Sequence, residues 1–307
     1  MHEYDRRNEL SKVSTRMKYD ICSIGHITRD KVVTPEKTVF MSGGTSFYMT
    51  YAISCLPRKV SYQLVTKVGK SEVPAVEKIR QMGIDTICYP SRDTVFFENI
   101  YGADSNERRQ RVLAKSDPFT LEEMKPLDAK IFHLGCLMAD DFSPEVVEYL
   151  ATKGTVSIDV QGYLRKVVGE EVHAIDWKDK QRILACTGIL KLNEEETRVI
   201  TGLQDIREAA KAIAKMGVKE VVVTLGSYGS TIYAEGEFHD IPTYQPACVV
   251  DATGCGDTFS AGYLYCRAQG AGYDEAGRFA AAMCALKLEH SGPFDRDIEA
   301  VERLMGA

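Results

Sequence analysis

The segment from Asp251 to Asp257 combines residue types that can hold and transfer a phosphoryl group. It reads Asp-Ala-Thr-Gly-Cys-Gly-Asp and lies between a strand-like run and a long Ala-rich helix pattern. Glycines let backbone N–H groups approach a ligand closely, and the N–H groups at a helix start lie at the positive end of the helix dipole. The segment therefore predicts an anion cradle suited to a phosphate. Within it, Asp257 either caps the helix or takes a proton from a hydroxyl as a general base.

Three other segments place a glycine pair or an acidic turn beside a strand or a helix. Ser42-Gly43-Gly44 precedes an apolar helix pattern, and Asn193-Glu194-Glu195-Glu196 ends a strand and opens a helix. Thr224-Leu225-Gly226-Ser227-Tyr228-Gly229 follows the buried strand pattern Val221-Val222-Val223. Each of these alone has an ordinary structural explanation as a turn or a helix cap. The combination of all four segments, in this order, indicates a function.

In this order the four segments resemble the PfkB family of carbohydrate kinases, also called the ribokinase family. The family signature is Asp-Thr-x-Gly-Ala-Gly-Asp, and Ala252 and Cys255 depart from it. Both replacements are small residues, so the turn is preserved. The resemblance covers roughly residues 18–305 and leaves residues 1–17 as an N-terminal tail.

The resemblance implies catalytic and donor-binding roles. Asp257 would be the general base, and the N–H groups of residues 254–257, which include Gly254, Cys255 and Gly256, would form an anion hole for the phosphoryl group. We interpret the Cys255 side chain as a packing residue, although a helix N-terminus can lower a thiol pKa. The residues expected to contact ATP are Asn193, Thr224, Gly226, Gly229, Thr253 and Gly254. Asn193 and Glu196 would be linked to Mg²⁺ through water, because Mg²⁺ tends to keep its waters.

Acceptor recognition is predicted at the ends of two strands. By resemblance, Asp30 would accept hydrogen bonds from sugar hydroxyls, and Gly43 and Gly44 would approach the acceptor. Gln161 and Arg165 follow a central strand and are candidates for the pocket rim, since ligands of doubly wound sheets bind at the carboxyl ends of strands. The run Thr45-Ser46-Phe47-Tyr48 replaces the Lys/Gly/Asn-containing run of ribokinases, which argues against ribose. Segments 94–101, 109–111 and 159–165 resemble a branch that includes myo-inositol kinase-like proteins.

Apolar strand patterns alternate with helix patterns from residue 18 onward. This alternation predicts an α/β fold with a doubly wound, mostly parallel sheet flanked by helices. We expect strands at 19–25, 60–68, 86–89, 129–134, 156–160, 189–192 and 220–225, and helices at 45–56, 73–82, 205–216, 258–269 and 273–289. Two β-rich segments near 29–41 and 93–115 interrupt the alternation, the second with a hairpin turn at 102–106. They predict a small β-sheet lid inserted in one kinase domain spanning 18–307.

Composition excludes several classes of protein. The 307 residues include 38 Lys plus Arg and 44 Asp plus Glu, so the net charge is −6, which argues against nucleic-acid or anionic-membrane partners. The sequence contains no run of about 18 apolar residues, so we expect no transmembrane helix. Nine cysteines are dispersed without a C-x-x-C pair, and residues 1–17 lack the apolar stretch of a signal peptide. Both features indicate a cytoplasmic protein with reduced thiols.

The sequence thus predicts an ATP-dependent kinase that phosphorylates a hydroxyl of a small sugar, polyol or nucleoside. The family resemblance adds a K⁺ site beside the Asp251–Thr253 loop, and exposed lid strands indicate a homodimer formed through the lid. One alternative is a catalytically silent ligand-binding relative, which would be expected to lose Asp257. The other is a dinucleotide-dependent oxidoreductase, which requires a G-x-G-x-x-G turn after the first strand, where the sequence instead has Gly25-His26-Ile27.

Overall fold

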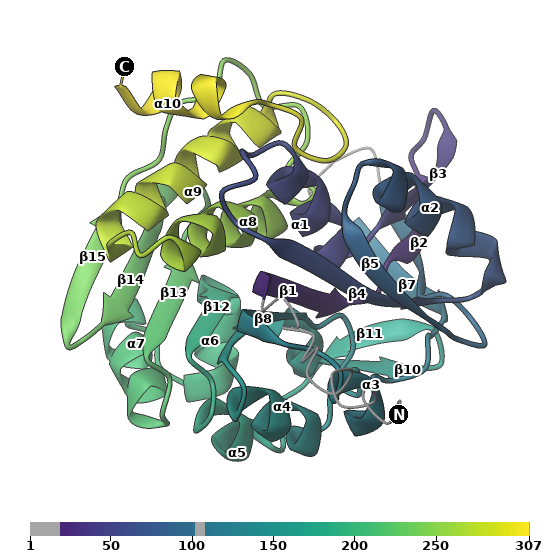
Figure 1. Ribbon diagram of the computed structural model, residues 1–307, viewed down its shortest axis with the longest axis horizontal. Coiled ribbons are helices and arrows are strands. Elements are labelled where there is room, and N and C mark those ends of the chain that lie inside the picture. The colour runs from purple at the N-terminus through teal and green to yellow at the C-terminus, as the bar shows by residue number, and fades with distance from the viewer. Residues whose placement is uncertain (1–18, 102–107, 307) are drawn as a thin grey trace, which may run out of the picture.

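The structure is a computed structural model, and it describes residues 19–101 and 108–306. The predicted tail at 1–17 and the predicted hairpin turn at 102–106 lie outside these residues. Nine strands form the main sheet and six form a second, smaller sheet (Figure 1). The α/β architecture is therefore the one that the sequence predicts. Of the helices in these two ranges, none has the length and apolar character needed to cross a membrane.

The main sheet is parallel from β13 to β5 and gains two antiparallel strands at one edge. In sheet order its strands are β15 (Glu237–Ile241), β14 (Ser230–Ala234), β13 (Glu220–Thr224), β12 (Ile189–Asn193), β9 (Thr155–Asp159), β8 (Ala129–Gly135), β1 (Tyr19–Gly25), β4 (Tyr62–Val68) and β5 (Asp85–Pro90). Val221, Val222 and Val223 are buried, as expected for a strand covered on both faces.

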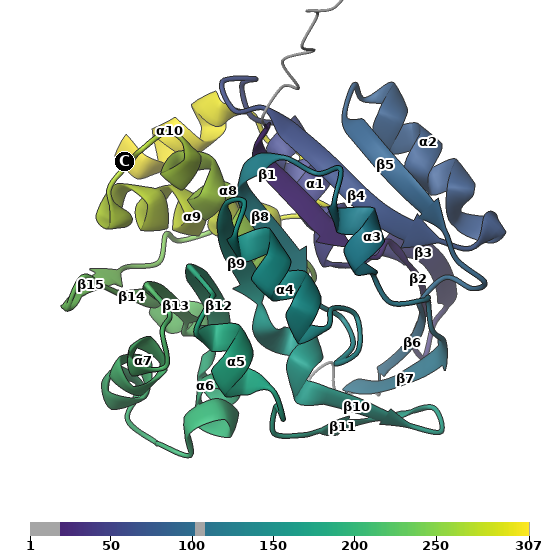
Figure 2. The same cartoon turned by 60° about the horizontal axis from the view of Figure 1, so that its bottom comes forward.

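Helices cover both faces of this sheet, and each face has its own apolar core between the sheet and the helices (Figures 1 and 2). One face carries α1 (Thr45–Ser54), α2 (Val73–Gln81), α8 (Cys255–Ala268), α9 (Tyr273–Leu288) and α10 (Ile298–Gly306). The other carries α3 (Leu121–Met124), α4 (Pro144–Ala151), α5 (Lys180–Leu184), α6 (Glu194–Thr201) and α7 (Ile206–Lys215). The doubly wound arrangement is thereby confirmed.

The second sheet has the strand order β10-β11-β7-β6-β2-β3. Its strands are β10 (Arg165–Val168), β11 (Glu171–Ala174), β7 (Arg108–Ala114), β6 (Phe96–Tyr101), β2 (Thr28–Val33) and β3 (Thr38–Gly43). The segments near 29–41 and 93–115 do pair with each other. The sequence analysis missed β10 and β11, because strands of four residues are too short for a polar–apolar pattern to stand out. Glu98 joins three strands by pairing with Lys31 and Arg111, each at 2.8 Å.

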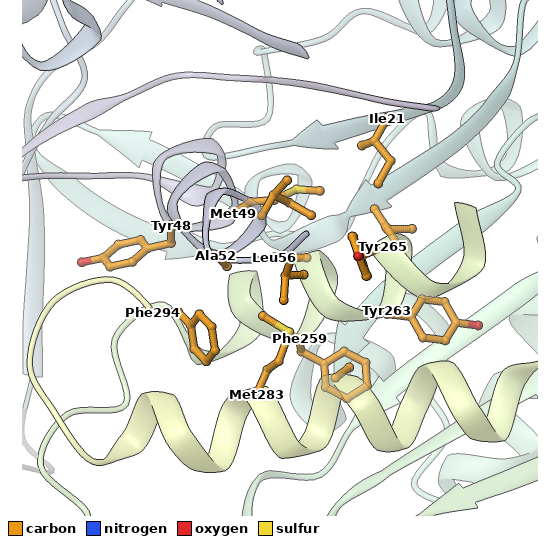
Figure 3. Close-up of a cluster of buried hydrophobic side chains, with 14 of the residues drawn as sticks. Ile21, Tyr48, Met49, Ala52, Leu56, Phe259, Tyr263, Tyr265, Met283 and Phe294 are labelled. Atoms are coloured by element: carbon orange, nitrogen blue, oxygen red, sulfur yellow. The ribbon is translucent and has the colours of Figure 1, made fainter. Parts of the chain in front are cut away.

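The start of α8 is held in place by a core shared with α1 and α9. Figure 3 shows Met49 and Ala52 of α1 in one cluster with Phe259 of α8 and Met283 of α9. α8 begins at Cys255, earlier than the predicted start at 258, and its N-cap is Gly254, which takes a left-handed conformation with φ 78° that glycine adopts readily. This earlier start places Asp257 inside the first helical turn.

Gly262 controls how closely α8 approaches α9. A Cβ atom at this position would lie 2.7 Å from Met283 Sδ and 3.0 Å from Ala280 Cα. We therefore expect Gly262→Ala to lower the free energy of unfolding by about 1–3 kcal/mol, measured by urea denaturation. Gly306→Ala is the control, because nothing lies within 4 Å of its added Cβ. Equal stability of both variants would mean that the helix contact is not the constraint.

Candidate active site

The glycines of the 251–257 segment allow two close approaches. A Cβ atom on Gly254 would lie 2.4 Å from the Tyr48 ring, and one on Gly256 would lie 2.7 Å from Lys191 Nζ. Thr253 N–H donates to Asp251 Oδ1 at 2.9 Å, which closes the loop before the helix. Larger residues at these two positions would push the loop away from α1 or displace the Lys191 ammonium.

Some, but not all, of the backbone N–H groups at the start of α8 are free to bind an anion. Cys255 N–H already donates to the Ala252 carbonyl at 3.1 Å. The first N–H groups of a helix have no partner within the helix, so those of Gly256 and Asp257 remain for a ligand, together with Gly254 of the loop. Burial raises the pKa of the Cys255 thiol to about 11, so this side chain stays protonated and packs rather than reacts.

Asp257 is a half-buried carboxylate at this helix start. Burial raises its pKa to about 6, and the nearby charge of Asp159 adds to the rise. Lys191, a hydrogen bond from Thr45 and Arg165 act in the opposite direction. A carboxyl group with this pKa is charged near neutral pH and yet basic enough to accept a proton.

A group of buried and half-buried charges surrounds Asp257. Lys191 Nζ pairs with Asp159 Oδ2 at 2.8 Å. Burial disfavours the Lys191 ammonium, but the carboxylates of Asp159, Glu196 and Asp257 outweigh this effect and raise its pKa. Burial alone would also raise the pKa of Asp159, but Lys191 lowers it. The sequence analysis missed Lys191, although a lysine inside the apolar run of β12 was an available signal.

One cavity of about 810 Å³ gathers the predicted acceptor residues around Asp257. Its lining includes Asp30, Gly44, Gln161 and Arg165. Gly43 does not line the cavity. Its added Cβ would lie 2.6 Å from Asp30 Oδ2, so this glycine leaves room for the Asp30 carboxylate.

Lid residues complete this cavity. The Thr28 hydroxyl donates to Asp30 Oδ1 at 2.7 Å and orients it. Asn99 and Gln110, joined by a 2.9 Å hydrogen bond, also line the cavity and were not predicted. Their cross-strand pairing depends on the lid hairpin, which sequence spacing alone could not align.

A second cavity of about 770 Å³ gathers Asn193, Thr224, Gly226 and Gly229. Its other side is apolar and is lined by Val249, Phe259, Ala281, Ala285 and Leu288. The two cavities share Ala252 and Gly256, so they meet at the glycine loop. Thr253 and Gly254, which the resemblance assigns to ATP, lie on the acceptor side of this junction.

Asn193 and Glu196 form a reciprocal cap at the start of α6. Glu196 N–H donates to Asn193 Oδ1 at 2.9 Å, and Asn193 N–H donates to Glu196 Oε2 at 2.8 Å. Burial and Asp159 raise the pKa of Glu196. Within residues 19–101 and 108–306, no group of three or more acidic, His or Cys side chains could itself hold a metal ion. The donor set thus fits an ion bound through water and phosphate better than one held by protein ligands alone.

Two cavities that meet at a glycine-rich helix start, with the carboxylate of Asp257 on one side, have the layout expected of a phosphotransferase. The profile of the pfkB family carbohydrate kinases matches residues 18–299. The chain therefore belongs to this family and is a carbohydrate kinase.

Individual relatives show the range of acceptors within this family. The chain is 28% identical over 256 residues to a cytidine kinase of Thermococcus kodakarensis, covering 80% of this chain and 87% of that protein. It is 26% identical over 290 residues to a ribokinase of Haemophilus influenzae, covering 89% of each. A solved pyrophosphate-dependent kinase of the ribokinase family, complexed with a pyrophosphate analog and myo-inositol, superposes with a TM-score of 0.81. Its identity is 26%, with coverage of 92% of this chain and 99% of that one.

The elevated pKa of Asp257 predicts an acidic limb in the rate profile. A general base must be unprotonated, so the turnover rate should fall as pH drops through about 6. Asp257→Asn should lower kcat by about 10²–10⁴-fold and remove this limb. The measurement is kcat against pH from 5 to 9 for both proteins.

Asp274→Asn is the matched control, because Asp274 lies in the first turn of α9 and pairs with His239 at the surface. The Asp257→Asn protein should melt no lower than the parent, since it loses a buried charge. A parent profile that is flat down to pH 5, or a fully active Asp257→Asn, would rule out Asp257 as the base.

Proposed function

We propose that this protein transfers the γ-phosphoryl group of ATP to a hydroxyl of a small polyol, sugar or nucleoside. The observation that carries the proposal is the junction of the two cavities at Ala252 and Gly256, with Asp257 on the acceptor side. A donor phosphate and an acceptor hydroxyl bound in these cavities would face each other across the glycine loop.

In the proposed reaction, Asp257 accepts the hydroxyl proton as the acceptor oxygen bonds to the γ-phosphorus. The bond to the leaving oxygen breaks in line, and ADP departs with the electron pair. Backbone N–H groups within residues 254–257 hold the phosphoryl oxygens, and Lys191 beside Gly256 offsets their charge. Most of the acceleration then comes from positioning and electrostatic stabilisation.

The apolar wall of the donor cavity favours a nucleotide over pyrophosphate. Phe259, Ala281 and Leu288 offer a surface on which a base can lie, whereas pyrophosphate has no apolar part to bury. When bound, Mg²⁺ would neutralise the charge of the donor phosphates, held near Asn193 and Glu196 through water.

A polyol is the acceptor that the other cavity fits best. Asp30, Asn99 and Gln110 of the second sheet and Gln161 of the turn after β9 supply acceptors and donors, as a molecule bearing several hydroxyls requires. The solved relative with myo-inositol supports this choice. The cytidine kinase relative makes a nucleoside the second candidate.

The remaining expectations concern the whole molecule. The lid would exclude water and limit ATP hydrolysis.

Edge strand β3 presents Val39 and Phe40, which are 39% and 53% exposed. Pairing two lids in a homodimer would cover these side chains, and light scattering can test for the dimer. Nine free cysteines support a cytoplasmic location, which cell fractionation can test. Family membership and the presence of Asp257 argue against the oxidoreductase and the silent relative.

If the donor is ATP, a larger side chain in the apolar wall should weaken the binding of ATP selectively. Ala281→Phe should raise the KM for ATP by at least about tenfold, because the added ring takes the space of the base. The KM for pyrophosphate, if it is used at all, should not change. Ala281→Ser is the control of similar size. Faster transfer from pyrophosphate than from ATP in the parent would overturn the assignment.

The acceptor assignment predicts that Asp30→Asn raises the acceptor KM by about 10–100-fold and leaves the KM for ATP unchanged. Glu171→Gln is the control, because Glu171 pairs with Arg109 in the same sheet outside the cavity. Acceptors are compared by ADP release across inositols, pentoses, hexoses and nucleosides. A nucleoside used far better than myo-inositol would replace the polyol as the acceptor, and no acceptor-stimulated release would contradict the kinase proposal.

A further inference from the structure

Lys287, in the last turn of α9, is a fully buried lysine whose side chain reaches the loop before the anion hole. α9 runs beside α8 in Figure 1, so its end lies next to the segment that precedes α8. Backbone bonds from Val250 N and Asp251 N to the Leu288 carbonyl, at 2.7 and 3.3 Å, join this loop to the end of α9.

The Lys287 ammonium is surrounded by oxygen acceptors. Its Nζ donates to the Asp251 carbonyl at 3.0 Å and to the His290 carbonyl at 3.2 Å. Asp251 Oδ2 lies 3.9 Å away. An ammonium has three donors and no acceptor, and the two carbonyls satisfy two of these donors. A buried charge is costly unless it is paired and hydrogen-bonded; here the carbonyls supply the hydrogen bonds, and the Asp251 carboxylate supplies the opposite charge.

The same contacts connect Lys287 to the anion hole. Asp251 uses its other carboxylate oxygen to accept from Thr253 N–H at 2.9 Å, and Ser291 donates to Asp251 Oδ2 at 3.3 Å. The cation therefore fixes Asp251, and Asp251 fixes the backbone just before Gly254. Without a positive charge here, two carbonyls and a carboxylate would face one another uncompensated.

Carbonyl and carboxylate oxygens grouped in this way are also the ligands of a hard monovalent cation, and they lie beside the loop where the family resemblance implies K⁺. The site does not fit a K⁺ ion, because the Lys287 ammonium already contacts these oxygens. We propose that Lys287 is the built-in cation of the Asp251–Thr253 loop, a positioning residue that makes this kinase independent of K⁺. The activity readout rests on the proposed function, whereas the stability readout below does not.

The first experiment compares the unmodified protein in chloride salts of K⁺, Na⁺ and tetramethylammonium at one ionic strength. We expect equal kcat, equal KM and equal melting temperatures in the three salts. Activation or thermal stabilisation by K⁺ over both other cations would overturn the proposal, because it would show a cation site that the lysine does not fill.

The second experiment removes the tethered charge and supplies a free one. Lys287→Ala vacates the space among the oxygens, and we expect kcat/KM in tetramethylammonium to fall by at least about tenfold. K⁺ or ammonium should restore much of the rate and raise the melting temperature. Lys287→Met should be impaired without rescue, because its side chain fills the space that a cation needs. Arg278→Ala is the control, an exposed charge on the same helix.

A folded Lys287→Ala protein that no monovalent cation rescues, in rate or in melting temperature, would reduce Lys287 to a packing role. If Lys287→Ala does not fold in any of the salts, the comparison of salts with the unmodified protein decides the question. If no acceptor is phosphorylated at all, the proposed function fails, while the melting temperatures of the parent and Lys287→Ala in each salt still test the cation.

Discussion

The proposed reaction depends on the Asp257 carboxylate, which has to stay charged although it is half-buried at the start of α8. Burial raises its pKa to about 6, and Lys191 together with the Thr45 hydrogen bond prevents a larger rise. The positive end of the α8 dipole acts in the same direction. A carboxylate balanced in this way is ready to accept a proton near neutral pH.

Packing makes this balance possible. The cluster of α1, α8 and α9 side chains in Figure 3 holds the start of α8 against Tyr48. The backbone at Gly254 and Gly256 lies so close to Tyr48 of α1 and to Lys191 that neither position has room for a Cβ atom. The catalytic geometry is therefore a consequence of how three helices and a strand end fit together.

An acidic chain can bind the proposed anionic donor because its positive charges are placed at the site, whatever the total charge of the protein. The net charge is −6, yet Lys191 lies beside Gly256 and Lys287 contacts Asp251. These two ammonium groups approach the 251–257 segment from different elements, β12 and α9. Lys287 is buried, Lys191 is only 13% exposed, and both are paired with a carboxylate, so neither adds to a basic surface that would attract nucleic acid or membranes.

The sequence by itself determined the fold class and the glycine loop, because strand and helix periodicity and the need for glycine are local properties of the chain. It also placed Asp30, Gln161 and Asp257 at element ends that do meet in one cavity. Only the tertiary structure decided that Lys191 and Lys287 face this loop. It also decided that Asn99 and Gln110 reach the acceptor side and that β10 and β11 extend the lid. These facts depend on contacts between residues far apart in the chain, and a buried lysine has no local pattern that reveals its partners.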